Sequence, residues 1–128
     1  MESSECPHSL EFYRGLDLFN REFYYECHEV WEEIWMEAKG EKKIFYQALI
    51  MAAVSLYHFG NENLRGALSC HQKAVAKFQQ LPGYYLSIDL EGFKKQLNEF
   101  YVDLLVEGTI FTEDLMRRPR PKLRLEPR

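Results

Sequence analysis

The sequence predicts an all-α fold, a single-domain antiparallel helical bundle of about five helices. Apolar residues recur at helical spacing along most of the 128 residues, whereas the alternation and Asn-Gly turns that are typical of strands are missing. Hydrophobic residues make up 46% of the chain and aromatic residues 15%. This is enough apolar material to build a core without a structural metal or disulfides.

Short polar residues, glycine and proline divide the chain into segments. We expect five helices, over residues 8–19, 21–39, 41–59, 63–80 and 89–107. Asn20 and Asn63 have short side chains whose oxygens can accept hydrogen bonds from the free N–H groups at the start of the second and fourth helices. Both are therefore predicted N-caps. Gly40 and Gly60 follow the last periodic residues of the second and third helices. A Pro-Gly pair breaks the chain before the fifth helix.

Each predicted helix has an apolar face at the spacing expected for a bundle. On the first two helices the apolar residues are Phe12, Leu16 and Phe19, then Phe23, Cys27, Val30, Ile34 and Ala38. The third helix is apolar nearly all round, which is typical of a central element. On the last two helices the stripes are Ala67, His71 or Cys70, Ala74, Phe78 and Leu81, then Phe93, Leu97, Phe100, Leu104 and Leu105.

The domain organisation that we expect is one helical bundle over residues 1–108, followed by an irregular segment over residues 109–128. The second segment is basic, rich in Arg and Pro, and offers few apolar side chains to bury. It can be a solvated tail or a strap over the bundle. Two histidines lie near the ends of this organisation or on its fourth helix. We expect His8 to lie at the protein surface and His71 to pack as a semi-buried residue of the fourth helix.

Composition and charge argue against several classes of function. The formal net charge is −4, and binding of nucleic acid depends mainly on neutralising phosphates with Lys and Arg, so nucleic acid is not an expected partner. No apolar run approaches the roughly 20 residues that span a bilayer, and the first residues lack the pattern of a signal peptide. Cys6, Cys27 and Cys70 are odd in number and widely spaced, which predicts reduced thiols in a cytoplasmic protein.

An unusual motif lies in the second predicted helix, where residues 26–35 read ECHEVWEEIW. At about 100° per residue, one flank of the apolar stripe consists of Tyr24, His28, Trp31, Glu32 and Trp35. His28 and Glu32 are four residues apart, so their side chains can touch. An imidazole between tryptophans and beside a carboxylate can have a shifted pKa. Glu29 lies toward the other side of the helix.

The third predicted helix has a matching polar stripe. It consists of Gln47, Met51, Ser55 and His58. The short connection at Gly40 predicts that the second and third helices are antiparallel neighbours, which would place this stripe against the His28 flank. The expected pocket therefore contains His28, Glu32, Gln47 and His58.

Three interpretations of this cluster are open. The polar groups can form a buried network that fixes the register of the helices. They can form a small-molecule or divalent-metal site, in which His28 acts as a general base or, with Glu32 and His58, as a metal ligand. The aromatic residues can form a protein-contact surface. The leading hypothesis is a non-catalytic binding or protein-interaction domain, with a second copy, another protein or a small molecule as partner. The alternative is an enzyme or ligand binder with this His/Glu/Gln pocket.

Several motifs resemble a known family. They are Phe19-Asn20, the run from Glu26 to Trp35, Gln47-Ala48-Leu49-Ile50, His58, and Asn63-Leu64-Arg65-Gly66-Ala67. Together they resemble the domain of unknown function family 309. The resemblance implies an all-α fold without an established activity, and a glycine in many members where this chain has Glu22. The family's typical polar and aromatic positions correspond to His28, Glu29, Glu32, Trp35, Gln47, His58 and Asn63.

Overall fold

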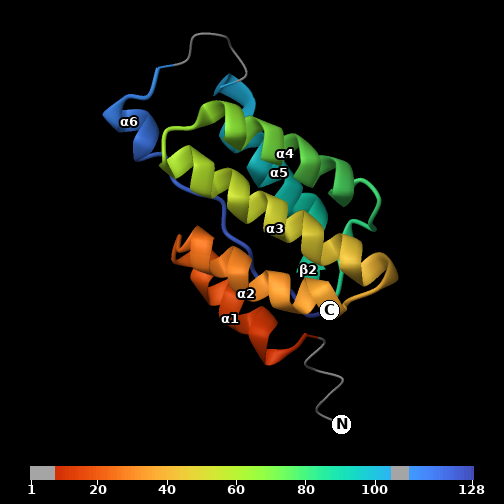
Figure 1. Ribbon diagram of the computed structural model, residues 1–128. Helices are drawn as coiled ribbons and strands as arrows, with labels where there is room; N and C mark the ends of the chain where they lie inside the picture. Colours follow the sequence, from red (N-terminus) through yellow and green to blue (C-terminus); the bar gives the residue numbers. More distant parts are fainter. Residues whose placement is uncertain (1–7, 105–109) are drawn as a thin grey trace.

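The computed structural model describes residues 8–104 and 110–128, and it confirms the predicted all-α bundle (Figure 1). The five expected helices are α1 (Leu10–Asn20), α2 (Tyr24–Glu37), α3 (Gly40–Gly60), α4 (Leu64–Phe78) and α5 (Leu90–Tyr101). Two short elements extend this set, a 3-10 turn (Val102–Leu104) and α6 (Glu113–Met116). The predicted end of the fifth helix at residue 107 and the predicted boundary at residue 108 lie outside the described residues.

The bundle is built from two helix pairs. α1 packs on α2, α3 packs on α4, and α3 also packs against α2, so α3 is the central helix. Figure 1 shows α3 and α4 side by side, with α5 behind them and the α1–α2 pair below. The central position of α3 explains why it is apolar on most of its surface, as the sequence predicted.

A small hairpin that the sequence did not predict lies between α4 and α5. β1 (Tyr84–Tyr85) pairs antiparallel with β2 (Ile88–Asp89). Leu86 and Ser87 form the turn with φ values of 48° and 67°, the left-handed conformation of the tight turns that fit hairpins. Strands of two residues are too short to show alternation, so the sequence carries no strand signal here.

The α1–α2 and α3–α4 connections share one geometry. The Phe23 N–H donates to the Leu18 carbonyl at 2.9 Å, and the Glu22 N–H donates to the Phe19 carbonyl at 3.0 Å. This is the Schellman arrangement that ends many helices. Glu22 has a φ of 69°, and Glu62 has the equivalent place with a φ of 59°. Glycine is favoured in this conformation, which accounts for the glycine that the family resemblance implies at position 22.

One of the two predicted N-caps is correct. The Asn63 side chain accepts a hydrogen bond from the Gly66 N–H at 3.0 Å and caps α4. The prediction for Asn20 is wrong, because Asn20 is the last residue of α1 and α2 begins only at Tyr24, without a side-chain cap. The Schellman turn takes up the residues between them, and the Asn20 amide instead bonds to Leu123.

Trp31 joins α2 to α1 and is the largest fully buried side chain. Its indole Nε1 donates to the Phe12 carbonyl at 3.2 Å, and its ring stacks on Phe12 and Phe19 with centroids 5.7 and 6.0 Å apart. Gly15 lies directly against the indole, since a Cβ atom at this position would be 2.2 Å from Nε1. The close approach of the two helices therefore requires glycine at position 15.

A buried polar contact joins α3, α4 and α5. The Ser55 hydroxyl donates to the Ala67 carbonyl at 2.7 Å. Because its proton is used there, the Tyr101 hydroxyl donates to the Ser55 oxygen at 2.6 Å. Buried hydroxyls need such partners, and this pair fixes the register of the three helices.

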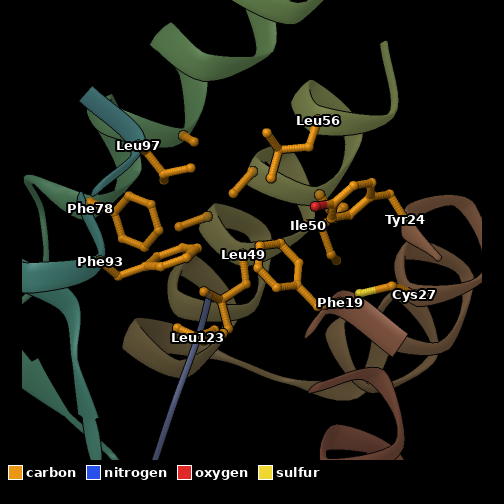
Figure 2. Packing of buried hydrophobic residues seen from close by; sticks show 14 of the residues in the cluster. Phe19, Tyr24, Cys27, Leu49, Ile50, Leu56, Phe78, Phe93, Leu97 and Leu123 are labelled. Atoms are coloured by element: carbon orange, nitrogen blue, oxygen red, sulfur yellow. The ribbon is translucent and has the colours of Figure 1, made fainter. Parts of the chain in front are cut away.

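Residues 117–126, called the strap below, cross the bundle. Figure 1 shows this segment running from α6 along the bundle toward the hairpin. Leu123 of the strap is fully buried, and Figure 2 shows it beside Leu49, Phe93 and Phe19 in the core. The strap therefore completes the apolar core from outside the five main helices.

Two expectations from composition can be compared with the structure. Among the described helices, none is long and apolar enough to cross a membrane. Cys27 and Cys70 are free, and burial raises the pKa of both thiols, which favours their protonated form. Cys6 lies outside the described residues.

Replacing Gly15 with alanine tests the α1–α2 contact. We expect Gly15→Ala to lower the free energy of unfolding by about 1–3 kcal/mol, because the added methyl group pushes the indole out of a packed core. Chemical denaturation followed by circular dichroism measures this change. Gly60→Ala is the matched control, because a Cβ atom there meets nothing within 4 Å. Equal stabilities of the two variants would contradict the proposed role of Gly15.

Candidate functional site

The residues of the predicted cluster on α2 occupy different environments. Trp31 does not share a surface with His28 but is fully buried against α1. Glu29 and Glu32 are exposed, and His28 is half-buried. The His28 Nδ1–H donates to the Tyr25 carbonyl at 2.6 Å, and its Nε2 lies 3.8 Å from the Glu32 carboxylate. The predicted contact between His28 and Glu32 is therefore present, at the protein surface.

The predicted residues on α3 and at the start of α4 form a second polar pair. The Asn63 amide lies 3.4 Å from Nδ1 of His58, and the Asn63 N–H donates to the His58 carbonyl at 2.9 Å. A Cβ atom on Gly66 would lie 3.1 Å from the His58 ring, so glycine allows the imidazole to pack on α4. His58 and Asn63 thus build the α3–α4 turn.

Trp35 and Gln47 complete the predicted set. Lys43 places its ammonium group 4.4 Å from the centroid of the Trp35 ring, and the Trp35 Nε1 is buried without a hydrogen-bond partner in the described part of the chain. Gln47 is half-buried on α3. The Lys43 contact is a cation–π interaction that ties the end of α2 to the start of α3.

The structure shows two separate polar pairs, His28 with Glu32 and His58 with Asn63. Within residues 8–104 and 110–128, no hydrogen bond or ion pair joins one pair to the other. No group of three or more His, Cys, Asp or Glu side chains in the same ranges is arranged to hold a metal ion. A metal site would need His28, Glu32 and His58 as one group, and the described geometry does not supply it.

Two other histidines are the buried ones. The expectation that His8 lies at the surface is wrong, since it is only 6% exposed. Its ring stacks on Phe12 at 3.8 Å, and its Nε2 donates to the Leu86 carbonyl at 2.7 Å. His71 packs on Tyr101 at 4.7 Å. Burial lowers the pKa of both imidazoles, and a hydrogen bond partly opposes this shift in each.

A different surface gathers exposed aromatic residues. Phe23, Tyr25 and Tyr57 are 45%, 48% and 38% exposed, and the Tyr25 and Tyr57 rings lie 5.5 Å apart across the α2–α3 boundary. All three line a hollow of about 330 Å³, together with Glu22 and Glu26. Phe23 was predicted in the apolar stripe of α2. It is exposed because it precedes the first turn of that helix.

Carboxylates cover the outer side of α2. Glu26 lines the same hollow as the rings, whereas Glu33 and Glu37 lie toward the other end of the helix, in a hollow with Lys39 and Lys42. The exposed glutamates of α2 are Glu26, Glu29, Glu32, Glu33 and Glu37. The helix contains neither Lys nor Arg, so no cation of its own offsets them. We call these five glutamates, with Phe23, Tyr25 and Tyr57, the α2 face. The Glu-rich run was visible in the sequence, whereas the exposure of the aromatic rings depends on where α2 begins.

Comparisons with known proteins agree with the resemblance. The family described as Domain of unknown function (DUF309) matches residues 12–70. This match confirms the resemblance over α1, α2, α3 and the start of α4. An "Uncharacterized protein YpuF" of Bacillus subtilis (strain 168) is 44% identical over 45 residues, 34% of this chain and 26% of that protein. An "Uncharacterized protein" of Aquifex aeolicus (strain VF5) is 30% identical over 77 residues, 59% of this chain and 23% of that protein. The chain thus spans about a quarter of the length of these curated relatives.

The buried histidines predict how stability depends on pH. As the pH falls below 6.5, the unfolded chain binds protons at His8 and His71 that the folded chain does not, because the pKa of each is lower in the folded state. The two imidazoles therefore make the free energy of unfolding decrease between pH 7 and pH 5. In His8→Phe, which keeps a ring against Phe12, we expect a smaller decrease. Urea denaturation at both pH values measures it, and identical decreases in variant and parent would disprove the assignment.

Proposed function

We propose that this chain is a non-catalytic protein-interaction domain whose α2 face binds a basic protein partner. The observation that carries the proposal is that the exposed rings of Phe23, Tyr25 and Tyr57 lie at one end of α2, a helix whose outer side carries five exposed glutamates. Contiguous exposed aromatic residues on a small protein are typical of binding surfaces. Their acidic surroundings favour a partner that supplies Lys and Arg.

The charge pattern of α2 supports a binding role because it does not favour folding. Glu29 lies four residues from Glu33, and Glu33 lies four residues from Glu37. Like charges at this spacing destabilise a helix by about 0.2–0.5 kcal/mol per pair. Glu32 has only His28 as a neighbour of opposite charge, at 3.8 Å and when the imidazole is protonated. Lys39 and Lys42 line one hollow with Glu33 and Glu37, so a basic partner would chiefly relieve the repulsion among the other glutamates of α2.

The chain also contains an example of the contact that such a partner would make. The Arg21 guanidinium lies 5.1 Å from the centroid of the Phe23 ring, next to the hollow. A cation over an aromatic ring and beside a carboxylate is held by both groups. The rings of Tyr25 and Tyr57 offer the same surface to a Lys or Arg of another protein. A second copy of this chain would bring like charges together, so we favour a different protein.

The proposal also places the protein in the cytoplasm. The free thiols of Cys27 and Cys70 support this location, because secreted domains of this size commonly pair their cysteines. Cys27 is fully buried, so its thiol has a packing role.

Charge reversal on α2 tests the proposed function. We expect Glu29→Lys with Glu33→Lys to weaken binding of a short Lys- and Arg-rich peptide by about tenfold or more, because each change removes an attraction and adds a repulsion. Fluorescence anisotropy with a labelled peptide at low and high salt measures the affinity. The helix should keep its stability, because the two changes replace one like-charge pair at i, i+4 by another while the repulsion between positions 33 and 37 becomes an attraction.

The control pair is Glu99→Lys with Asp114→Lys, which changes the net charge equally at exposed positions away from α2. The control should keep most of the binding. Equal losses in both double variants would show an effect of net charge only and would refute the α2 face as the site. The absence of peptide binding by the parent protein would refute it as well.

A further inference from the structure

The strap is held through its main chain on two sides. The Asn20 amide donates to the Leu123 carbonyl at 2.8 Å, and its oxygen accepts from the Leu123 N–H at 2.9 Å. The Gln96 amide makes the same two bonds to the adjacent residue, Lys122, at 3.1 and 3.0 Å. Asn20 lies on α1 and Gln96 on α5. The two helices thus form the walls of one groove, and each wall makes hydrogen bonds to one of two consecutive strap residues. Main-chain hydrogen bonds of this kind give affinity for extended peptides in general.

The groove also selects side chains. Leu123 fills an apolar seat in the core (Figure 2). Two residues further on, Leu125 pairs with Ile88 of β2, and the Glu126 N–H donates to the Ser87 carbonyl at 2.7 Å. The end of the strap thus adds an extended segment to the edge of the hairpin, which is a common way to bind a peptide.

Cations occupy alternate positions before the leucine. Arg118 makes a bidentate pair with Asp103, with both distances 2.8 Å. Arg120 lies 4.9 Å from the centroid of the Phe59 ring. The Lys122 ammonium donates to the Asn20 carbonyl at 2.8 Å. Prolines at the two positions between these cations keep the segment extended.

The strap has the character of a ligand that can be exchanged. Only Pro121 and Leu123 of the strap are buried, and the Arg118–Asp103 pair is in contact with solvent, where ion pairs are screened and weak. The family match ends at residue 70. It therefore includes Asn20 on α1 and excludes the strap together with the α5 wall at Gln96. Residues 117–128 hold six of the 16 Lys and Arg residues of an otherwise acidic chain.

We propose that the groove between α1 and α5 is a peptide-binding groove, and that the strap is its competitor within the same chain. The partner is an extended segment of another protein in which cations alternate with prolines before a leucine. This partner would make the Asn20 and Gln96 main-chain bonds, place its leucine in the Leu123 seat and set its cations at Asp103 and Phe59.

The groove adjoins the α2 face, because Arg120 lines the hollow there and Lys122 lies 3.5 Å from Glu22. The competition experiment is therefore done in a parent that carries Glu29→Lys with Glu33→Lys, so that the α2 face does not bind the basic probe.

A full-length competition experiment tests this inference. The probe is a fluorescent peptide with the sequence of residues 117–128, and the parent protein should bind it weakly because the tethered strap has a high effective concentration. In Leu123→Ala, which loosens the strap, we expect the peptide to bind at least about tenfold more tightly. Adding Asn20→Ala to this variant should abolish binding. Adding Gln72→Ala, which removes an exposed amide on α4, should leave binding unchanged.

Circular dichroism first establishes that each variant is folded. If Leu123→Ala does not fold, Arg118→Ala replaces it. This change releases the pair with Asp103 and the contacts with Phe100 but leaves the leucine in place, so it should give a smaller gain in affinity. A folded, loosened variant that does not bind the peptide would overturn the proposal. Equal effects of Asn20→Ala and Gln72→Ala would also overturn it. A dimer of the parent protein that exchanges straps would overturn it too, because a second copy would then be the partner.

Discussion

The indole of Trp31 against Gly15 is the contact on which the arrangement of α1 and α2 depends. It fixes how close the two helices lie and how α2 is rotated about its axis. With Trp31 directed into the core, the glutamates about half a turn away on α2 must point to solvent. The acidic surface is therefore a consequence of the packing of one buried side chain, and the position of His28 at the edge of that surface follows from the same rotation.

The fold could be predicted because most of its determinants are local. Helical spacing located all five main helices, and Asn63 was recognisable as a cap because its acceptor bond reaches only three residues along the chain. The errors concern residues whose partners are distant in sequence. His8 is buried, and its hydrogen-bond acceptor is the Leu86 carbonyl, 78 residues away. The Asn20 amide donates to the carbonyl of Leu123, 103 residues further along the chain. Single-sequence periodicity does not contain such pairings.

The candidate site was predicted only in part for the same reason. The i, i+4 spacing of His28 and Glu32 correctly placed the two side chains together. The spacing along α3 did not reveal that His58 is part of the α3–α4 turn, where its ring lies beside Asn63 and Gly66. A helical wheel gives directions around one axis, whereas a pocket between helices depends on the rotation of both. Trp31, which looks like a neighbour of His28 on the wheel, is directed toward α1 instead.

The strap also bears on the order in which the molecule assembles. Both helix pairs close through turns of a few residues, whereas the contact of Asn20 with Leu123 closes a loop of 103 residues. The chain entropy lost in closing a loop grows with its length, and contacts between distant residues form slowly. The helix pairs are thus expected to form early and the strap to dock last. By the same reasoning it is the first part to detach, so amide hydrogens at its docking seam should exchange with solvent well before those of α3.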